Sequence, residues 1–232
     1  MSGGGPGAHH RGMPTDRTAR KARRTGRLVP AGLLALGFVP LLAGAVRLTE
    51  LTGGAEITAA NARFFAAPVP IVAHVVGVTA YTAGGAFQFA ARFRRRRRGW
   101  HRAAGRVLVG CGLVAALSGL WMTTFSALPP GDEGLLTVFR WVAGTAMLGS
   151  LVLGFLAVRR RDIRRHRAWM IRAYAIGLGA GTQALTQAAW LLGGGGPPGP
   201  LARALLLALG WVINVVVAEL IIRRRGWRVS AA

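Results

Sequence analysis

The chain has 232 residues, a formal net charge of +23 and a hydrophobic content of 52%. A nucleic-acid-binding surface spreads its cations over a folded face among polar and aromatic residues, but this chain confines its cations to the gaps between long apolar runs. This arrangement favours a lipid bilayer and anionic lipids as partners and argues against nucleic acid. Because Cys111 is the only cysteine, the chain forms no internal disulfide.

Six apolar runs are long enough to cross a membrane. A spanning helix needs about 20 mostly apolar residues, because the hydrocarbon core is about 30 Å thick and each residue rises about 1.5 Å. The runs are continuously apolar rather than alternating, which favours helices over a barrel. The predicted fold class is therefore all-α, a polytopic bundle of six transmembrane helices at about 28–46, 69–91, 103–125, 135–158, 168–192 and 201–222.

The regions outside the runs complete the predicted domain organisation. Residues 1–26 are rich in Gly, Arg, Thr and Pro and are predicted to be a disordered basic tail. Residues 27–225 would form the membrane domain, and residues 226–232 a short tail. The first run also resembles a signal peptide, because Ala43-Gly44-Ala45 offers a cleavage sequence. No soluble domain follows it, which favours a retained helix.

The basic residues predict the orientation. Twenty-six of the 30 Lys and Arg lie in four segments that surround the ends of the runs on one side: 1–27, 92–106, 159–172 and 223–228. Cytoplasmic segments carry an excess of Lys and Arg. We therefore expect both termini to be cytoplasmic, in a multi-pass protein of the inner or plasma membrane. The remaining basic residues, together with most of the acids, fall on the opposite side: Arg47, Arg63, Arg140, Arg203, Glu50, Glu56, Asp132 and Glu133.

Polar residues inside the second run share one face. His74, Tyr81 and Gln88 are spaced by seven residues, and a helix drifts by only about 20° over that interval. The three side chains would line a track about 21 Å long. They are predicted to form a polar track or a cofactor-facing wall, or alternatively hydrogen bonds between helices.

Two basic motifs open the third and fifth runs. Each begins with a histidine followed by an arginine at the same predicted membrane depth. Such groups favour anions such as phosphate or a lipid headgroup, although they are also ordinary interface anchors. The predicted ligand-binding residues are His101, Arg102, Arg106, His166, Arg167 and Arg172.

The last two runs contain further polar residues, Gln183, Asn214 and Glu219. Glu219 is the only carboxylate within a predicted run and can pair with Arg223 four residues on. A proton-handling role is the alternative. Small residues also repeat at four-residue spacing, as in Cys111-Ala115-Gly119, and predict close helix packing.

Four segments together resemble a bacterial family of multi-helix membrane proteins catalogued as a domain of unknown function. They are HVVGVTAYTAGGAFQF (74–89), HRAAGR (101–106), RRDIRRHRAWMIRAYA (160–175) and WVINVVVAELII (211–222). The resemblance covers about residues 35–223 and implies a fold but no established activity. The family pattern has an arginine in the middle of the fifth helix, where this chain has GTQALTQ.

A looser likeness is to transmembrane b-type cytochromes, which hold haem between histidines on adjacent helices. That likeness implies at most one haem b, with His101 and His166 as its metal ligands. No GxSxG, Walker, HExxH or CxxC motif occurs in the sequence. Whether the protein is an enzyme is left open.

The leading hypothesis is a binding protein that holds an anionic lipid or small ligand at the basic cytoplasmic cluster. The alternatives are a mono-haem oxidoreductase that exchanges electrons with a quinone, and a small transporter or proton-coupled carrier. The carrier would use the His74–Tyr81–Gln88 track together with Glu219. The ligand, the cofactor and the oligomeric state stay open.

Overall fold

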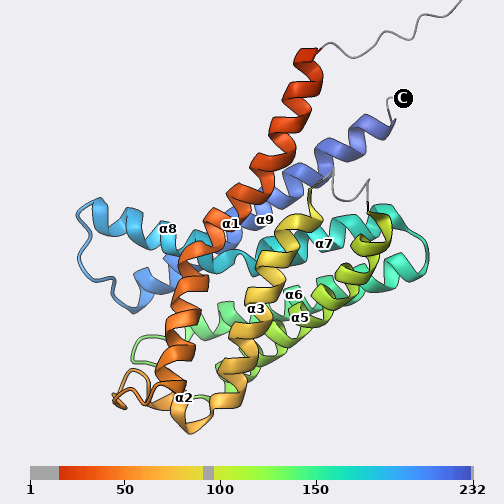
Figure 1. Ribbon diagram of the computed structural model, residues 1–232. Helices are drawn as coiled ribbons and strands as arrows, with labels where there is room; N and C mark the ends of the chain where they lie inside the picture. The colour runs from red at the N-terminus through yellow and green to blue at the C-terminus, as the bar shows by residue number, and fades with distance from the viewer. Residues whose placement is uncertain (1–15, 91–96, 231–232) are drawn as a thin grey trace, which may run out of the picture.

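The computed structural model describes residues 16–90 and 97–230, and this part of the chain is helical throughout apart from its connections (Figure 1). The helices, in chain order, are α1 (Asp16–Thr52), α2 (Ala62–Ala66), α3 (Pro68–Gln88), α5 (Arg98–Phe125), α6 (Leu135–Arg159), α7 (Ile163–Gly177), α8 (Gly179–Leu192) and α9 (Pro200–Ser230). The predicted all-α fold class is confirmed.

Five helical segments are long and apolar enough to cross a membrane: Leu28–Thr52, Pro68–Gln88, Gly99–Phe125, Leu135–Arg159 and Pro200–Arg224. They coincide with five of the six predicted runs. The fifth predicted run, 168–192, is instead divided between α7 and α8, of 15 and 14 residues, which meet at Leu178. A single continuous helix over this run was therefore a wrong prediction, and the sixth crossing stays a prediction.

The first and last helices of the chain, α1 and α9, extend beyond the bundle at the same end, at the top of Figure 1. The helix α1 begins at Asp16, so the described part of the predicted disordered tail is helical. The helix α9 runs to Ser230, through most of the predicted C-terminal tail. Residues 1–15, 91–96 and 231–232, which include Arg94 to Arg96 of the arginine run, lie outside the described residues. Cytoplasmic termini stay a prediction.

Apolar side chains cover the outer faces of the spans. Phe38 of α1 is 62% exposed, and Val107 of α5, Val142 of α6 and Val212 of α9 are similarly exposed. Contiguous exposed apolar surface on several helices is expected where a bilayer, rather than water, surrounds the protein. The exposure pattern therefore agrees with a membrane protein whose outer faces contact lipid.

The core lies where α3, α5, α6 and α7 meet. Tyr81, Leu151 and Tyr174 are buried there among residues of all four helices. The Tyr174 hydroxyl donates a 2.8 Å hydrogen bond to the Thr82 carbonyl, and its ring lies 4.8 Å from that of Phe89, centroid to centroid. Because a buried hydroxyl needs a partner, this bond fixes α7 against α3.

Small residues set the spacing between α3 and α5. A Cβ atom added at Gly77 would lie 2.9 Å from the Cys111 carbonyl oxygen and 3.1 Å from the Ala115 nitrogen. Gly119 lies against the imidazole ring of His74. The predicted Cys111-Ala115-Gly119 stripe is therefore a packing surface, and it faces α3.

Replacing Gly77 by Ala should destabilise the bundle by about 1–3 kcal/mol, because the added methyl group would overlap the α5 backbone. Gly110→Ala is the matched control, since a Cβ at Gly110 would meet no atom within 4 Å. Thermal unfolding of the detergent-solubilised protein measures both effects. Equal melting temperatures for the two variants would contradict this account of the α3–α5 contact.

Candidate functional site

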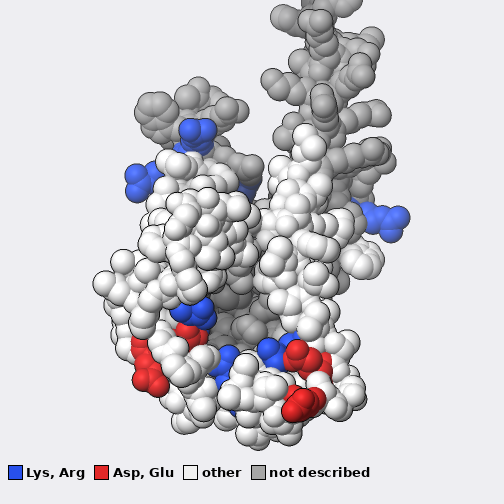
Figure 2. Space-filling view, turned by 90° about the vertical axis from the view of Figure 1, so that its left-hand side faces the viewer, with Lys and Arg blue, Asp and Glu red and all other residues white. Residues whose placement is uncertain are grey.

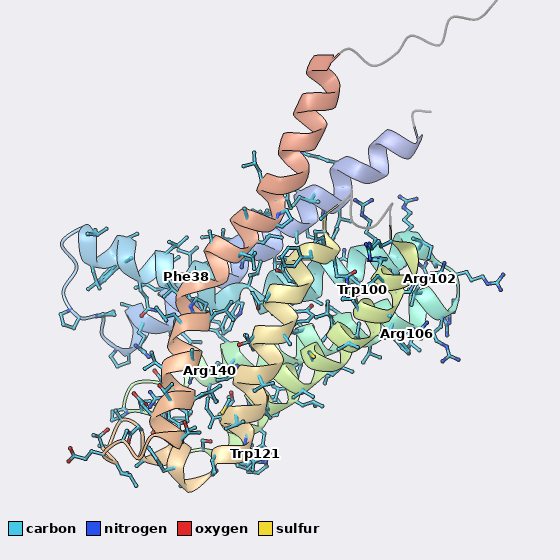
Figure 3. The ribbon with its side chains drawn as sticks, in the orientation of Figure 1. Phe38, Trp100, Arg102, Arg106, Trp121 and Arg140 are labelled. Atoms are coloured by element: carbon cyan, nitrogen blue, oxygen red, sulfur yellow. The ribbon has the colours of Figure 1, made fainter. Side chains whose placement is uncertain are left out.

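Two groups of polar residues occupy opposite ends of the bundle. Figure 3 labels Trp100, Arg102 and Arg106 on the N-terminal part of α5 at one end, and Trp121 and Arg140 at the other. The end with Trp100, Arg102 and Arg106 is here called the cationic end. The end that carries Arg140 is called the Asp132 end, after the buried carboxylate that Arg140 binds.

The three polar residues of α3 all lie toward α5, as their spacing predicts. His74 Nδ1 lies 2.9 Å from the Ala115 carbonyl oxygen and 3.3 Å from the Ser118 hydroxyl. Tyr81 is buried against Gly112 of α5, and Gln88 lines a pocket with α5 residues. For His74, these contacts match the alternative of hydrogen bonds between helices.

A pocket of about 700 Å³ lies between the C-terminal part of α3 and the N-terminal part of α5, at the cationic end. Its α5 wall contains Trp100, Ala103, Ala104 and Val107, which repeat at three- and four-residue spacing and so share a helix face. Apolar atoms dominate the wall. Arg97 and Gln88 are its polar members.

Of the six residues predicted to bind a ligand, those on α5 and those on α7 have different surroundings. Arg102 and Arg106 are exposed on α5 beside the pocket-lining face, and Arg167 is exposed on α7. His166 Nδ1 lies 2.8 Å from the Gly154 carbonyl oxygen of α6. The α7 histidine therefore has a structural partner, and the common site for all six residues stays a prediction.

Arg172 belongs to an ion pair with Glu219. Its Nε and Nη2 atoms donate to the two carboxylate oxygens of Glu219, at 2.5 and 3.0 Å, and its guanidinium lies 4.6 Å from the centroid of the Trp169 ring. The sequence predicted Arg223 as the partner of Glu219. The two-point bond to Arg172 joins α7 to α9 instead, because a guanidinium matches both carboxylate oxygens at once.

Asn214 supports the junction between α7 and α8. Helix α7 stops at Gly177, so carbonyl groups of its last turn lack the next helical donors. Asn214 Nδ2 of α9 donates a 3.0 Å hydrogen bond to the Ala175 carbonyl oxygen. Trp211 lies against Gly179, where a Cβ atom would overlap its indole ring. The helix junction is thus satisfied by α9, as a bilayer requires.

Helix α8 is held to α9 by further polar contacts. Thr182 Oγ1 lies 2.7 Å from Asn214 Oδ1, Gln183 Nε2 donates to the Leu207 carbonyl at 2.9 Å, and Thr186 Oγ1 donates to that of Leu206 at 2.9 Å. Gln183 and Asn214 were predicted as intramembrane polar residues. Both are bonded between helices, so each has a structural role.

Asn214→Leu should lower the free energy of unfolding by about 1–2 kcal/mol, because the Ala175 carbonyl and Thr182 lose their partner in an apolar region. Gln187→Leu is the control, since the hydrogen bond from its side chain stays within α8 and is long, at 3.4 Å. Chemical unfolding in mixed micelles would compare the two. An equal decrease in the free energy of unfolding for Gln187→Leu would contradict the role assigned to Asn214.

Asp132 organises the opposite end. It is 2% exposed, and its two carboxylate oxygens accept from Arg140 Nη2 at 2.6 Å and from Arg203 Nε at 2.7 Å. Burial acts to raise the pKa of Asp132, but the hydrogen bonds and charges of the two arginines outweigh it and hold this pKa below its ordinary value. The sequence placed these residues on one side of the membrane but did not bring them together.

Asp132→Asn should destabilise the protein by about 2 kcal/mol at neutral pH and by less in acid. A pKa lowered by folding means that the stabilisation is complete above the unfolded value of about 4 and is lost as the pH falls through the folded value. Melting temperatures from pH 7 to pH 3 test this. Glu133→Gln, at the exposed neighbouring position, is the control, and a gap between wild type and Asp132→Asn that is constant with pH would refute the linkage.

The described residues contain no group of three or more His, Cys, Asp or Glu that could hold a metal ion. The haem alternative needs only two ligands. His166 Nδ1 contacts Gly154, so Nε2 is the atom through which His166 would coordinate iron. A haem between His101 and His166 stays a prediction.

Comparison with known proteins supports the resemblance seen in the sequence. The family model described as "Predicted membrane protein (DUF2306)" matches residues 71–222, from α3 to α9. Neither the search of curated proteins nor that of solved structures found a match. The match contains the α3–α5 pocket, the α7–α8 junction and Asp132. Since it covers more than half of the chain, the protein belongs to the DUF2306 family of membrane proteins.

Proposed function

We propose that the protein binds an anionic lipid, or an amphiphile of the same kind, in the α3–α5 pocket at the cationic end. The observation that carries the proposal is the make-up of the pocket wall. Phe87, Ala104, Val107 and similar residues give the pocket an apolar lining, and Arg97 is among the residues of the same wall. Such a wall matches a molecule with an apolar chain and an anionic head.

The size of the pocket suits this class of ligand. Small-molecule sites usually enclose about 300–1,000 Å³, with mostly apolar walls and a few polar groups that orient the ligand. The α3–α5 pocket, at about 700 Å³, has room for a headgroup and part of an acyl chain. Trp100, which is 62% exposed at the rim, is of the residue type that prefers the membrane interface.

Gln88 supplies a second polar contact. Its Oε1 atom is buried and has no hydrogen-bond partner among the described residues. A buried acceptor without a partner costs about 1–3 kcal/mol, and a hydroxyl group of a lipid headgroup would remove that cost. Arg97 would attract the negative charge, while Gln88 would orient the polar part of the ligand.

Charge around the pocket favours an anion. Arg102 and Arg106 alternate with the pocket-lining residues along α5 and are exposed. A basic residue near an anionic membrane surface contributes about 1 kcal/mol of attraction. The part of the predicted ligand set on α5 therefore supports the proposal, while Arg172 is neutralised by Glu219.

Two alternatives stay predictions without a specific supporting observation. Electron transfer would need the haem between His101 and His166. Transport along the α3 face would need polar groups that are free to bind a substrate, whereas His74 contacts Ala115 and Ser118. Lipid binding would instead use Arg97 and the Oε1 atom of Gln88, which has no hydrogen-bond partner among the described residues.

Arg97→Gln should weaken binding of phosphatidylglycerol about fivefold, the equivalent of about 1 kcal/mol for one basic residue. Ala104→Leu should weaken phosphatidylglycerol binding more than Arg97→Gln does, because the larger side chain fills part of the pocket. Native mass spectrometry of the full chain, titrated with phosphatidylglycerol or phosphatidylcholine of the same acyl chains, measures both.

The matched controls keep the charge change and the volume change but place them elsewhere. Arg164→Gln alters an exposed arginine of α7, and Ala146→Leu alters an exposed alanine of α6. Both should bind phosphatidylglycerol like wild type. If Arg97→Gln and Ala104→Leu also bind like wild type, or if phosphatidylcholine binds equally well, the proposal is wrong.

A further inference from the structure

A second polar site lies at the Asp132 end, apart from the α3–α5 pocket, and centres on Arg63 of α2. The guanidinium groups of Arg63 and Arg47 each lie 4.5 Å from the centroid of the Phe64 ring. Arg63 Nε is buried without a hydrogen-bond partner, and none of the described carboxylates forms an ion pair with Arg63. Stacking on Phe64 therefore holds the guanidinium of Arg63, and its Nε donor has no hydrogen-bond partner among the described residues.

A small cavity opens beside Arg63. Its volume is about 140 Å³, and its walls include Arg63, Arg140, Thr123, Ser126, Met122 and Leu128. Since one water molecule occupies about 30 Å³ in the liquid, the cavity has the volume of about five waters. That volume suits an oxyanion of five heavy atoms.

The charges around the cavity leave an excess of positive charge. Arg47 is paired with Glu50, and the single carboxylate of Asp132 serves both Arg140 and Arg203. Asp132, Arg140 and Arg203 together carry one net positive charge, and the charge of Arg63 adds a second. Figure 2 shows Lys and Arg side chains on the walls of a hollow in the lower part of the molecule, with Asp and Glu side chains beside them.

Electrostatics agrees with the geometry. Burial lowers the pKa of Arg63 by desolvating its guanidinium, and the positive charges of Arg140, Arg47 and Arg203 lower this pKa further, while Asp132 opposes them. A guanidinium keeps its proton in proteins. Burial and the nearby positive charges therefore raise the free energy of the charged Arg63 side chain. An anion in the cavity would relieve it.

We propose that this cavity binds a small oxyanion of the phosphate type between the guanidinium groups of Arg63 and Arg140. The planar guanidinium matches two oxygens of a phosphoryl group at once. Arg140 uses Nη2 for Asp132, and a guanidinium has five N–H donors, so it retains donors for the anion. Ser126 and Thr123 line the same cavity, where the Thr123 hydroxyl already donates to the Gly119 carbonyl oxygen at 2.8 Å.

The oxyanion has two sources with the same chemistry, free phosphate and the phosphate of a phospholipid headgroup. The first arm of the test titrates inorganic phosphate into the full chain in a phosphate-free detergent, at constant ionic strength, and follows thermal unfolding. The melting temperature should rise with phosphate and saturate, because a ligand that binds only the folded state stabilises it. Chloride at the same ionic strength should give no such saturating rise.

Three variants locate the effect. Arg63→Gln should abolish the phosphate response, and Arg63→Lys, which keeps the charge but loses the two-point geometry, should weaken phosphate binding at least tenfold. Arg164→Gln, an exposed position at the cationic end, should respond like wild type. Because Arg63→Lys preserves the charge balance at the Asp132 end, it keeps the test informative if Arg63→Gln fails to fold.

The second arm compares retention of phosphatidylglycerol and of a phosphate-free glycolipid by native mass spectrometry. A phosphate response that depends on Arg63 assigns the site to the free ion. Retention of phosphatidylglycerol that depends on Arg63, without a phosphate response, assigns it to the headgroup. No response in either arm, or equal responses in wild type and Arg63→Lys, overturns the proposal. The α3–α5 pocket is tested at Arg97 and Ala104, so failure of one proposal leaves the other standing.

Discussion

The structure depends on one constraint, which is that polar groups within the bilayer must find their partners inside the protein. Several polar side chains of the helices meet it by bonding to carbonyl groups of other helices. His74 contacts the Ala115 carbonyl, Tyr174 donates to that of Thr82, and Asn214 donates to that of Ala175. These contacts join α3 to α5, α7 to α3 and α9 to α7. The main role of these polar residues is therefore to hold helices together by hydrogen bonds.

Side chains that join helices and side chains that bind ligands are expected in different parts of the bundle. A side chain that holds two helices together is costly to move, because moving it leaves a carbonyl group unsatisfied in an apolar region. Groups that bind ligands must therefore lie where the cross-links end. Both pockets satisfy this condition. One lies between Gln88 and Arg97, where α3 ends, and the other lies where α5 ends, beside Ser126.

Sequence patterns predicted what depends on local composition and missed what depends on contacts between distant residues. Five spans follow from apolar runs alone. The junction at Leu178 does not, because its flanking residues are as apolar as the rest, and the donor that satisfies it, Asn214, lies 39 residues from Ala175. The i, i+4 rule favoured Arg223 for Glu219, but Arg172, 47 residues away, wins because it offers two parallel bonds. The α3 face was predictable because seven-residue spacing is a property of one helix.

The four arginines outside the basic segments raise a different question, because the charge rule predicts that cytoplasmic segments, rather than the segments of these four, carry the basic residues. Three of them have a local explanation: Arg47 pairs with Glu50, while Arg140 and Arg203 enclose Asp132. Arg63 forms no ion pair with a carboxylate among the described residues. Burial and the neighbouring cations disfavour its charge, while the more distant Asp132 favours it. An arginine that is desolvated and lies near other cations needs compensating interactions, and stacking on Phe64 contributes only about 0.5–2 kcal/mol. The cavity beside Arg63 is where the missing compensation would come from.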